Sequence, residues 1–179
     1  MLQQARSNRA RTTRRRAGRR SGEGSPAVRI RAASLDDLDG LVALERSCFR
    51  GVYRDHRWDQ RRFRYYLGEP RGMLAVADGE GGVEGYVAGY VAKRPGGPTA
   101  LLYSLAVAPG ARRRGIGDRL LQWFSRRARD AGCSSATLEV ARSRREARRL
   151  FARHGFELIQ RLPDHYAPGR EAVRMRRQY

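Results

Sequence analysis

LLYSLAVAPGARRRGIGDRLL, residues 101–121, is the segment that decides the fold of this chain. Its apolar first part, residues 101–107, predicts a buried strand, which Pro109 and Gly110 bring to an end. A helix is predicted directly afterwards, because apolar residues recur on one helical face at Leu120, Leu121, Phe124 and Ala128. A strand, a turn with glycine and a helix N-terminus together favour phosphate binding, because the first helical N–H groups have no partner inside the helix.

The turn between this strand and this helix is rich in arginine and glycine. Residues 112–114 are all arginine, and Gly115 and Gly117 have no Cβ, so an anionic ligand can lie against bare backbone. A dinucleotide-binding fingerprint would need a third glycine where Leu120 stands, and a P-loop would need a Gly-Lys-Ser/Thr sequence that the chain lacks. An ordinary strand-to-helix turn with solvated arginines is the structural alternative.

The chain is strongly basic, with a formal net charge of +20 over 179 residues, a length that favours one domain. Residues 1–26 hold eight arginines and one glutamate, a net of +7, which leaves +13 for residues 27–179. Lys93 is the only lysine, so coding bias in a GC-rich genome explains the arginine content as readily as function does.

The first 26 residues are polar and nearly free of apolar side chains, so they cannot bury enough surface to offset the entropy of ordering. We therefore predict a disordered basic tail at residues 1–26, followed by a folded domain at residues 27–179. Three roles for the tail remain open: contact with RNA or the ribosome through residues 1–20, a transit peptide, and an incidental extension.

The two cysteines, Cys48 and Cys133, lack metal-ligand spacing and argue against a disulfide scaffold or a zinc site. We expect both to be small buried residues, and we expect no metal. No apolar run is long enough to span a bilayer, and no apolar signal segment follows the basic start. These observations predict a cytoplasmic protein without membrane contact.

Hydrophobic periodicity predicts an α/β domain in which strands and helices alternate in the second half of the chain. We expect strands at residues 27–33, 73–77, 83–92, 99–107, 136–140, 156–161 and 172–175, and helices at 35–47, 58–67, 117–131 and 144–154. The second to fourth strands should form an antiparallel meander, since a Gly-rich turn joins the first two of them. The whole predicts a mixed sheet with helices on both faces.

The turn at residues 112–117, after a strand that ends in Leu-Ala-Val-x-Pro, resembles the Arg/Gln-x-x-Gly-x-Gly/Ala loop of the GCN5-related N-acetyltransferases (GNAT). Leu138-Glu139-Val140, Phe151 and His154-Gly155-Phe156 are similar to a block of the ribosomal-protein alanine N-acetyltransferases, the RimI-like branch, and residues 164–172 are similar to that branch's ending. The resemblance covers about residues 27–179. It implies the GNAT fold, a mostly antiparallel mixed sheet splayed between its fourth and fifth strands, with helices on both faces.

The resemblance implies that acetyl-CoA, the co-substrate of the family, lies between the splayed strands 101–107 and 136–140. In this family the first strand binds the pantetheine arm, and the backbone N–H at the position of Val107 polarises the thioester carbonyl. The loop takes the pyrophosphate, and Arg144, where the family commonly has Asn, is assigned to the 3′-phosphate. The implied cofactor residues are Leu105, Val107, Arg112, Arg113, Arg114, Gly115, Ile116, Gly117, Asp118 and Arg144.

Glu139 matches the general base of the RimI-like branch, and its structural alternative is a salt bridge to an arginine. Phe151 stands where the branch has the tyrosine that protonates the leaving thiolate, and phenylalanine cannot donate a proton. Tyr166 is our hypothesis for that acid, and its alternative role is to close the acceptor cleft. Aromatic residues of the segment between the first two strands are further candidates for the acceptor site: Tyr53, Trp58, Tyr65 and Tyr66.

The resemblance implies an N-acetyltransferase that acts on a primary amine, with a protein N-terminal α-amine as the favoured acceptor and a ribosomal protein as one such substrate. The first alternative is an acetyltransferase for a small amine metabolite. The second is a non-catalytic RNA- or ribosome-binding protein on a GNAT scaffold, for which the missing tyrosine at Phe151 is the best support. A strongly positive molecule repels polyamines, which tilts the choice towards a protein acceptor.

Overall fold

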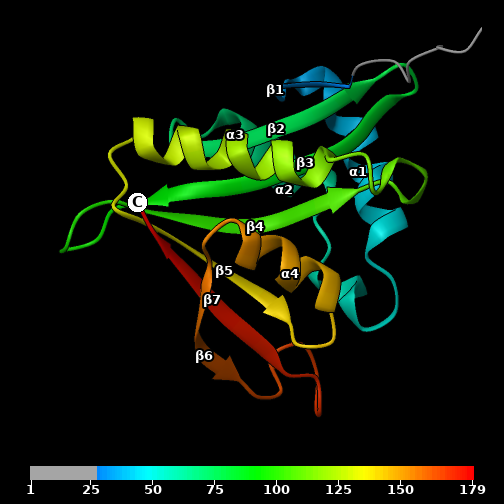
Figure 1. The fold of residues 1–179 in the computed structure, drawn as a ribbon. Helices are drawn as coiled ribbons and strands as arrows, with labels where there is room; N and C mark the ends of the chain where they lie inside the picture. The colour runs from blue at the N-terminus through cyan, green and yellow to red at the C-terminus, as the bar shows by residue number, and fades with distance from the viewer. Residues whose placement is uncertain (1–27) are drawn as a thin grey trace, which may run out of the picture.

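The computed structural model describes residues 28–179, and the predicted tail, residues 1–26, with the RNA or ribosome contact assigned to residues 1–20, lies outside the described residues (Figure 1). The described strands form one seven-stranded sheet in the order β1-β2-β3-β4-β5-β7-β6. Their bounds are β1 (Arg29–Ala32), β2 (Gly72–Gly79), β3 (Gly82–Ala92), β4 (Thr99–Val107), β5 (Ser135–Ala141), β6 (Glu157–Leu162) and β7 (Ala172–Gln178).

Neighbouring strands of this sheet are antiparallel at every position except between β4 and β5, which are parallel. The parallel pairing is short, because it joins residues 99–102 of β4 to residues 135–138 of β5 and then stops. Beyond that point β5 stays paired with β7, whereas β4 stays paired with β3, and Figure 1 shows the two central strands diverging. The predicted mixed sheet with a splay between the fourth and fifth strands is confirmed.

Two helices cover each face of the sheet, as predicted. The helices α1 (Leu38–Cys48) and α2 (Gln60–Gly68) pack on one face with the core residues Leu41, Phe63 and Tyr86. The helices α3 (Ile116–Asp130) and α4 (Arg145–Arg153) lie on the other face, where the side chains of Leu120, Phe124 and Phe151 are buried. Three short 3-10 turns complete the described elements: η1 (Leu35–Asp37), η2 (Gly51–His56) and η3 (Pro109–Ala111).

The predicted element boundaries hold to within a few residues, and each shift has a local cause. The strand predicted at residues 99–107 is found with these bounds. The helix predicted from Trp58 begins at Gln60 instead, because the carboxylate of Asp59 accepts a hydrogen bond from the N–H of Arg62 at 2.8 Å and caps the helix there. The predicted capping box is present at the first helical turn, with Asp37 accepting from the N–H of Ser34 at 2.8 Å.

A β-bulge interrupts the pairing of β3 with β4. Ala88 lies opposite Ser104 and Gly89 lies opposite Leu102, so Tyr103 has no partner residue in β3. As a result the side chain of Leu102 joins the core under α3, whereas Ser104 faces the buried Tyr86 on the α1 side. The bulge therefore re-aims the side chains of β4 at the point where β5 leaves it.

Candidate functional site

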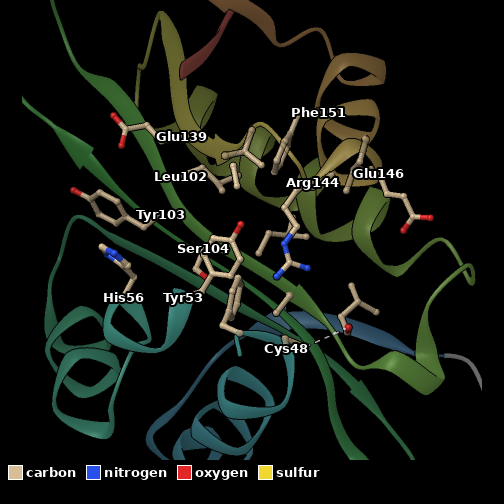
Figure 2. A pocket seen from close by; sticks show the side chains of 18 of the residues that line it. Cys48, Tyr53, His56, Leu102, Tyr103, Ser104, Glu139, Arg144, Glu146 and Phe151 are labelled. Carbon is tan, nitrogen blue, oxygen red and sulfur yellow. Dashed lines mark hydrogen bonds between the residues drawn. The ribbon is translucent and has the colours of Figure 1, made fainter. Parts of the chain in front are cut away.

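A pocket of about 540 Å³ opens where β4 and β5 separate (Figure 2). One wall is the stretch of β4 from Leu102 to Val107, and the opposite wall is Glu139–Ala141 of β5 with the start of α4. The segment between α1 and α2 closes a further side, and it contributes Tyr53, His56 and Trp58. The sheet splay thus produces a large hollow that residues of both central strands line.

The pocket collects several of the residues predicted from the sequence. Leu105, Val107, Arg112 and Arg144 line it, and so do the proposed catalytic residues, Glu139 and Tyr166. The other predicted cofactor residues lie outside the lining, at the turn and first helical residues that follow β4: Arg113, Arg114, Gly115, Ile116, Gly117 and Asp118.

The start of α3 offers backbone N–H groups without a side-chain cap. Gly115 precedes the helix in the left-handed conformation, with φ of 73°, and a Cβ there would have no heavy atom within 4 Å. Arg113 also has a positive φ, of 62°, which is uncommon for a residue with a side chain. The loop therefore leaves open space in front of a positive helix end, which suits an anion.

The side chains of this turn do not all face one ligand. The Nε of Arg112 donates to the carbonyl of Val107 at 3.2 Å, and Arg114 is paired with Glu84 of β3 at 3.1 Å. The carboxylate of Asp118 accepts from Arg153 and from His154 of the neighbouring α4 segment, at 3.1 and 3.0 Å. Burial acts to raise the pKa of Asp118, but these hydrogen bonds hold it below its ordinary value. The side chain of Asp118 thus braces α3 against α4.

Glu139 carries two partners that line it up within the pocket. Its Oε1 accepts from the Nε and the Nη2 of Arg174 at 3.0 and 2.6 Å, and its Oε2 lies 3.0 Å from the Nε2 of His165. Arg174 stands directly opposite Glu139 in the pairing of β5 with β7. The salt bridge that the sequence offered as an alternative to the base is therefore present, and Glu139 also lines the pocket, with its carboxylate directed away from Arg144 and Phe151 in Figure 2.

Tyr166 lies in the connection between β6 and β7 and is surrounded by other rings. Its ring contacts Tyr53 at 5.2 Å, His56 at 5.3 Å and His165 at 4.8 Å between centroids. Burial raises the pKa of Tyr166 to about 12, and the negative charge of Glu139 acts in the same direction. The phenol therefore keeps its proton at neutral pH.

Arg144 and Phe151 occupy the α4 side of the pocket. The guanidinium carbon of Arg144 lies 4.9 Å from the centroid of the Tyr53 ring, a cation–π contact that crosses the pocket. Phe151 is buried against Phe156, at 5.9 Å between centroids. The aromatic side chain at position 151 thus packs in the core as well as lining the pocket.

A buried polar network in the wall of the pocket was not predicted from the sequence. The carboxylate of Glu45 on α1 accepts from the N–H of Trp58 at 2.9 Å and from the hydroxyl of Tyr86, and that hydroxyl lies 2.6 Å from the Oγ of Ser104 on β4. Glu45 and Tyr86 are almost inaccessible. A glutamate on the apolar side of a predicted helix is the signal that points to such a network.

The two cysteines differ in their surroundings. Cys133 is buried as expected, and burial raises the pKa of its thiol. Cys48 is only half-buried, which corrects the expectation for that residue: its Sγ lies 3.5 Å from the carbonyl oxygen of Val107 and borders the pocket. The cause is its place at the last residue of α1, directly beneath the splayed part of β4.

No group of three or more His, Cys, Asp or Glu side chains within residues 28–179 is arranged to hold a metal ion. In the same part of the chain, no helix has the length and apolar character needed to cross a membrane.

Comparison with known proteins places this geometry in a family context. Residues 38–156 match the family model described as "Acetyltransferase (GNAT) family". The chain is 29% identical over 153 residues to "N-alpha-acetyltransferase daf-31" of Caenorhabditis elegans, covering 84% of this chain and 82% of that protein.

Two solved structures illustrate the shared fold. The ribosomal-protein-S18-alanine N-acetyltransferase of Escherichia coli is 22% identical with a TM-score of 0.72, covering 84% of this chain and 92% of the other. Naa50 of Arabidopsis thaliana, in complex with the bisubstrate analogue CoA-Ac-MVNAL, is 17% identical with a TM-score of 0.73, covering 86% and 99%.

Proposed function

The chain belongs to the acetyltransferase (GNAT) family and is an acetyl-transfer enzyme, and we propose that it moves the acetyl group of acetyl-CoA to the α-amine of a protein N-terminus. The relative from C. elegans carries the name of an enzyme for such amines. The Arabidopsis structure of the same fold holds an analogue that joins CoA to a peptide. A ribosomal protein is one acceptor of this kind, as in the E. coli enzyme of the RimI-like branch.

One observation carries this proposal: β4 loses its partner β5 after Leu102, and a pocket fills the gap with Glu139 on the opposite wall. A strand edge without a neighbour offers backbone N–H and C=O groups to an extended ligand. The pantetheine arm is such a ligand, and the backbone of Leu105 and Val107 is our assignment for its partners.

The loop after β4 fits the phosphates of acetyl-CoA. The start of α3 has no side-chain cap, the space beside Gly115 is open, and Arg112 lines the adjoining pocket. We assign the pyrophosphate to the backbone N–H groups of residues 113–118 and the 3′-phosphate to Arg144. The bound co-substrate would supply an activated acyl thioester with a thiolate as leaving group.

The remaining chemistry concerns two protons. An N-terminal ammonium must lose a proton before its nitrogen lone pair can attack a carbonyl carbon, and we propose that Glu139 accepts it, directly or through a water. The thiolate that leaves would take a proton, and Tyr166 is our candidate donor since Phe151 has none to give. Thiols titrate near pH 8–9, so this second transfer is the less demanding of the two.

Two contacts of Glu139 support this role. Arg174 and His165 each hold one carboxylate oxygen, which fixes the orientation of the carboxylate. His165 lies between Glu139 and Tyr166, so the acceptor amine would meet all three groups at one end of the pocket.

The test combines binding with turnover on the full-length chain. Calorimetry should find acetyl-CoA binding, and release of CoA should follow when N-terminal peptides are added but not when polyamines are. The variant Glu139→Gln should bind acetyl-CoA and lose turnover, whereas Glu157→Gln, an exposed carboxylate on β6, should behave as the wild type. Turnover with small amines and not with peptides would contradict the proposed acceptor, and absent acetyl-CoA binding would contradict the site.

A further inference from the structure

Five aromatic side chains form a continuous cluster on the α2 side of the sheet, buried at Trp58 and exposed at Tyr65 and Tyr103, which we call the aromatic platform: Trp58, Tyr65, Tyr66, Tyr90 and Tyr103. Tyr66 lies at its centre, stacked on Trp58 at 4.8 Å and in contact with Tyr103 at 5.6 Å, Tyr90 at 6.0 Å and Tyr65 at 5.2 Å. Tyr65 and Tyr103 remain 57% and 40% exposed. These rings are packed against one another yet leave two large faces open.

The bulge in β4 is what brings Tyr103 onto this surface. Regular pairing would give Tyr103 a partner in β3, but the register passes from Ser104 to Leu102 and leaves Tyr103 out. Bulges occur next to binding sites because they re-aim one side chain without ending the strand. Tyr103 is therefore held in a conformation that presents its ring outward.

The platform is continuous with the acceptor end of the pocket. Trp58 and Tyr103 belong to both, since each lines the pocket and contacts Tyr66. Figure 2 shows Tyr103 and His56 at the end of the pocket where Glu139 lies, with Arg144 and Glu146 towards the other end. A chain that leaves Glu139 on the α2 side would therefore pass over Tyr103 and reach Tyr66.

Two arginines give the platform a positive charge. The guanidinium carbon of Arg62 lies 4.6 Å from the Trp58 centroid, and that of Arg71 lies 4.9 Å from the Tyr90 centroid. Residues 59–71 hold two acidic side chains, the Asp59 that caps α2 and the Glu69 that accepts a hydrogen bond from Tyr65, against four arginines, so this segment keeps a net positive charge. The charge on this face thus complements acidic groups of a ligand.

We propose that the aromatic platform binds the residues that follow the acceptor residue of a peptide substrate, and that it selects for aromatic side chains flanked by acidic ones. This inference rests on the proposed function, because it places the N-terminal amine at Glu139. The ring separations from Tyr103 through Tyr66 to Tyr65 add to about 11 Å, which about three residues of extended chain span. We assign these three positions to the second to fourth residues of the substrate.

The experiment compares two peptides of equal length with the same N-terminal residue. One carries tyrosine and glutamate at the second to fourth positions, and the other carries alanine and lysine there. For the full-length wild type we expect a higher kcat/KM for the first peptide. Because one aromatic pair contributes a factor of roughly 2 to 12, Tyr65→Ala and Tyr103→Ala should each lower the ratio of the two kcat/KM values by that factor.

Two control variants separate the loss of a ring contact from a general effect of mutation on activity. Tyr103→Phe should keep the preference for the aromatic peptide, and Ile159→Ala, which removes an exposed apolar side chain on β6, should leave both peptides unaffected. The inference is wrong if the wild type turns over the two peptides equally. It is also wrong if Tyr65→Ala and Tyr103→Ala leave the ratio of the two kcat/KM values unchanged. Either result would leave the proposed function intact.

Two further outcomes would contradict a peptide-binding role of the aromatic platform. Absence of turnover with any peptide would overturn the proposed function, and the platform as a substrate site with it. If single-stranded oligonucleotide binding, rather than peptide preference, is lost in Tyr65→Ala, then the platform serves a nucleic acid and the inference is wrong.

Discussion

At the scale of single residues, the proposed chemistry rests on one carboxylate that two side chains hold. Glu139 is in register with Arg174 across β5 and β7, and His165 comes from the loop that joins β6 to β7. The sequence identified Glu139 through its resemblance to a known block, but it could not identify Arg174 or His165. Their contact depends on strand register, which sequence spacing alone does not give.

The first prediction concerns Glu139. We expect Glu139→Gln to lower kcat by about 10²- to 10⁴-fold, because general base catalysis contributes on that scale. Gln keeps the size of the side chain and an acceptor for Arg174, so acetyl-CoA affinity measured by calorimetry should be retained. A variant with near wild-type kcat would leave Glu139 with only the structural role of an ion-pair partner.

The second prediction concerns Glu45, the buried carboxylate in the pocket wall. Burial raises the pKa of Glu45, and hydrogen bonds from Tyr86 and Trp58 oppose that shift only in part. Because the folded-state pKa is raised, the protonated group contributes stability below its unfolded pKa, and that contribution is lost as pH rises through the folded value. Glu45→Gln should remove this pH-dependent loss of stability, because Gln stays neutral. Its amide can accept a hydrogen bond from the Trp58 N–H and donate one to the Tyr86 hydroxyl.

The measurement is urea unfolding of the wild type and Glu45→Gln from pH 4 to pH 8, where the difference should move in favour of the variant as pH rises. Glu45→Ala should cost about 1–3 kcal/mol at any pH in this range, because the Trp58 N–H and Tyr86 hydroxyl lose their acceptor. Parallel pH profiles for wild type and Glu45→Gln would contradict the raised pKa.

At the scale of elements, the most predictable parts were those with local signals. The strand at residues 99–107 has an apolar run with clear stops, and α3 begins where the glycine turn ends. No residue of β4 signals the bulge at Tyr103. The close contact beside the bulge is at Gly89, on the neighbouring strand β3. A Cβ at Gly89 would stand 2.4 Å from the Phe124 ring and 2.5 Å from the Leu101 carbonyl, so β3 and β4 meet α3 at a contact that only glycine allows.

The third prediction belongs to the turn before α3. Gly115→Ala should lower the free energy of unfolding by about 1–2 kcal/mol, because φ of 73° is unfavourable for a residue with a Cβ. Its methyl group would also occupy the space assigned to the pyrophosphate, so acetyl-CoA affinity should fall roughly tenfold, a loss of about 1.4 kcal/mol.

Gly132 provides the matched control at the other end of α3. It has the same φ of 73° and open space where a Cβ would stand. Gly132→Ala should therefore cost similar stability without changing acetyl-CoA affinity in calorimetry. Equal acetyl-CoA affinity in the two variants would contradict a pyrophosphate site at the start of α3.

At the scale of the whole molecule, the sheet splay and the charge act together. The splay creates the pocket, and the net charge of +13 on residues 27–179 gives the folded domain a positive field. The sequence predicted the splay only through family resemblance, since no periodicity reports where two parallel strands stop pairing. Three rings of the aromatic platform, Trp58, Tyr65 and Tyr66, were acceptor-site candidates from the sequence. Tyr90 and Tyr103 were not, because they come from β3 and β4 and only the fold brings them to α2.

The fourth prediction follows from that field. Acetyl-CoA carries several phosphate charges, so its affinity should fall as salt rises from low to high ionic strength, where exposed charges are screened over about 10 Å or less. Titrations of the full-length chain at two salt concentrations would measure this effect. Affinity independent of salt would show that backbone groups and the pantetheine arm, rather than the arginines, hold the co-substrate.

The central claim is that the acceptor is the α-amine of a peptide. The most direct test incubates the full-length chain and acetyl-CoA with a peptide that carries both a free N-terminus and a lysine side chain, and then locates the acetyl group by tandem mass spectrometry. We predict one acetyl group on the N-terminal nitrogen, and its loss in Glu139→Gln. Acetylation of the lysine, or of added small amines while the peptide stays unmodified, would contradict the account.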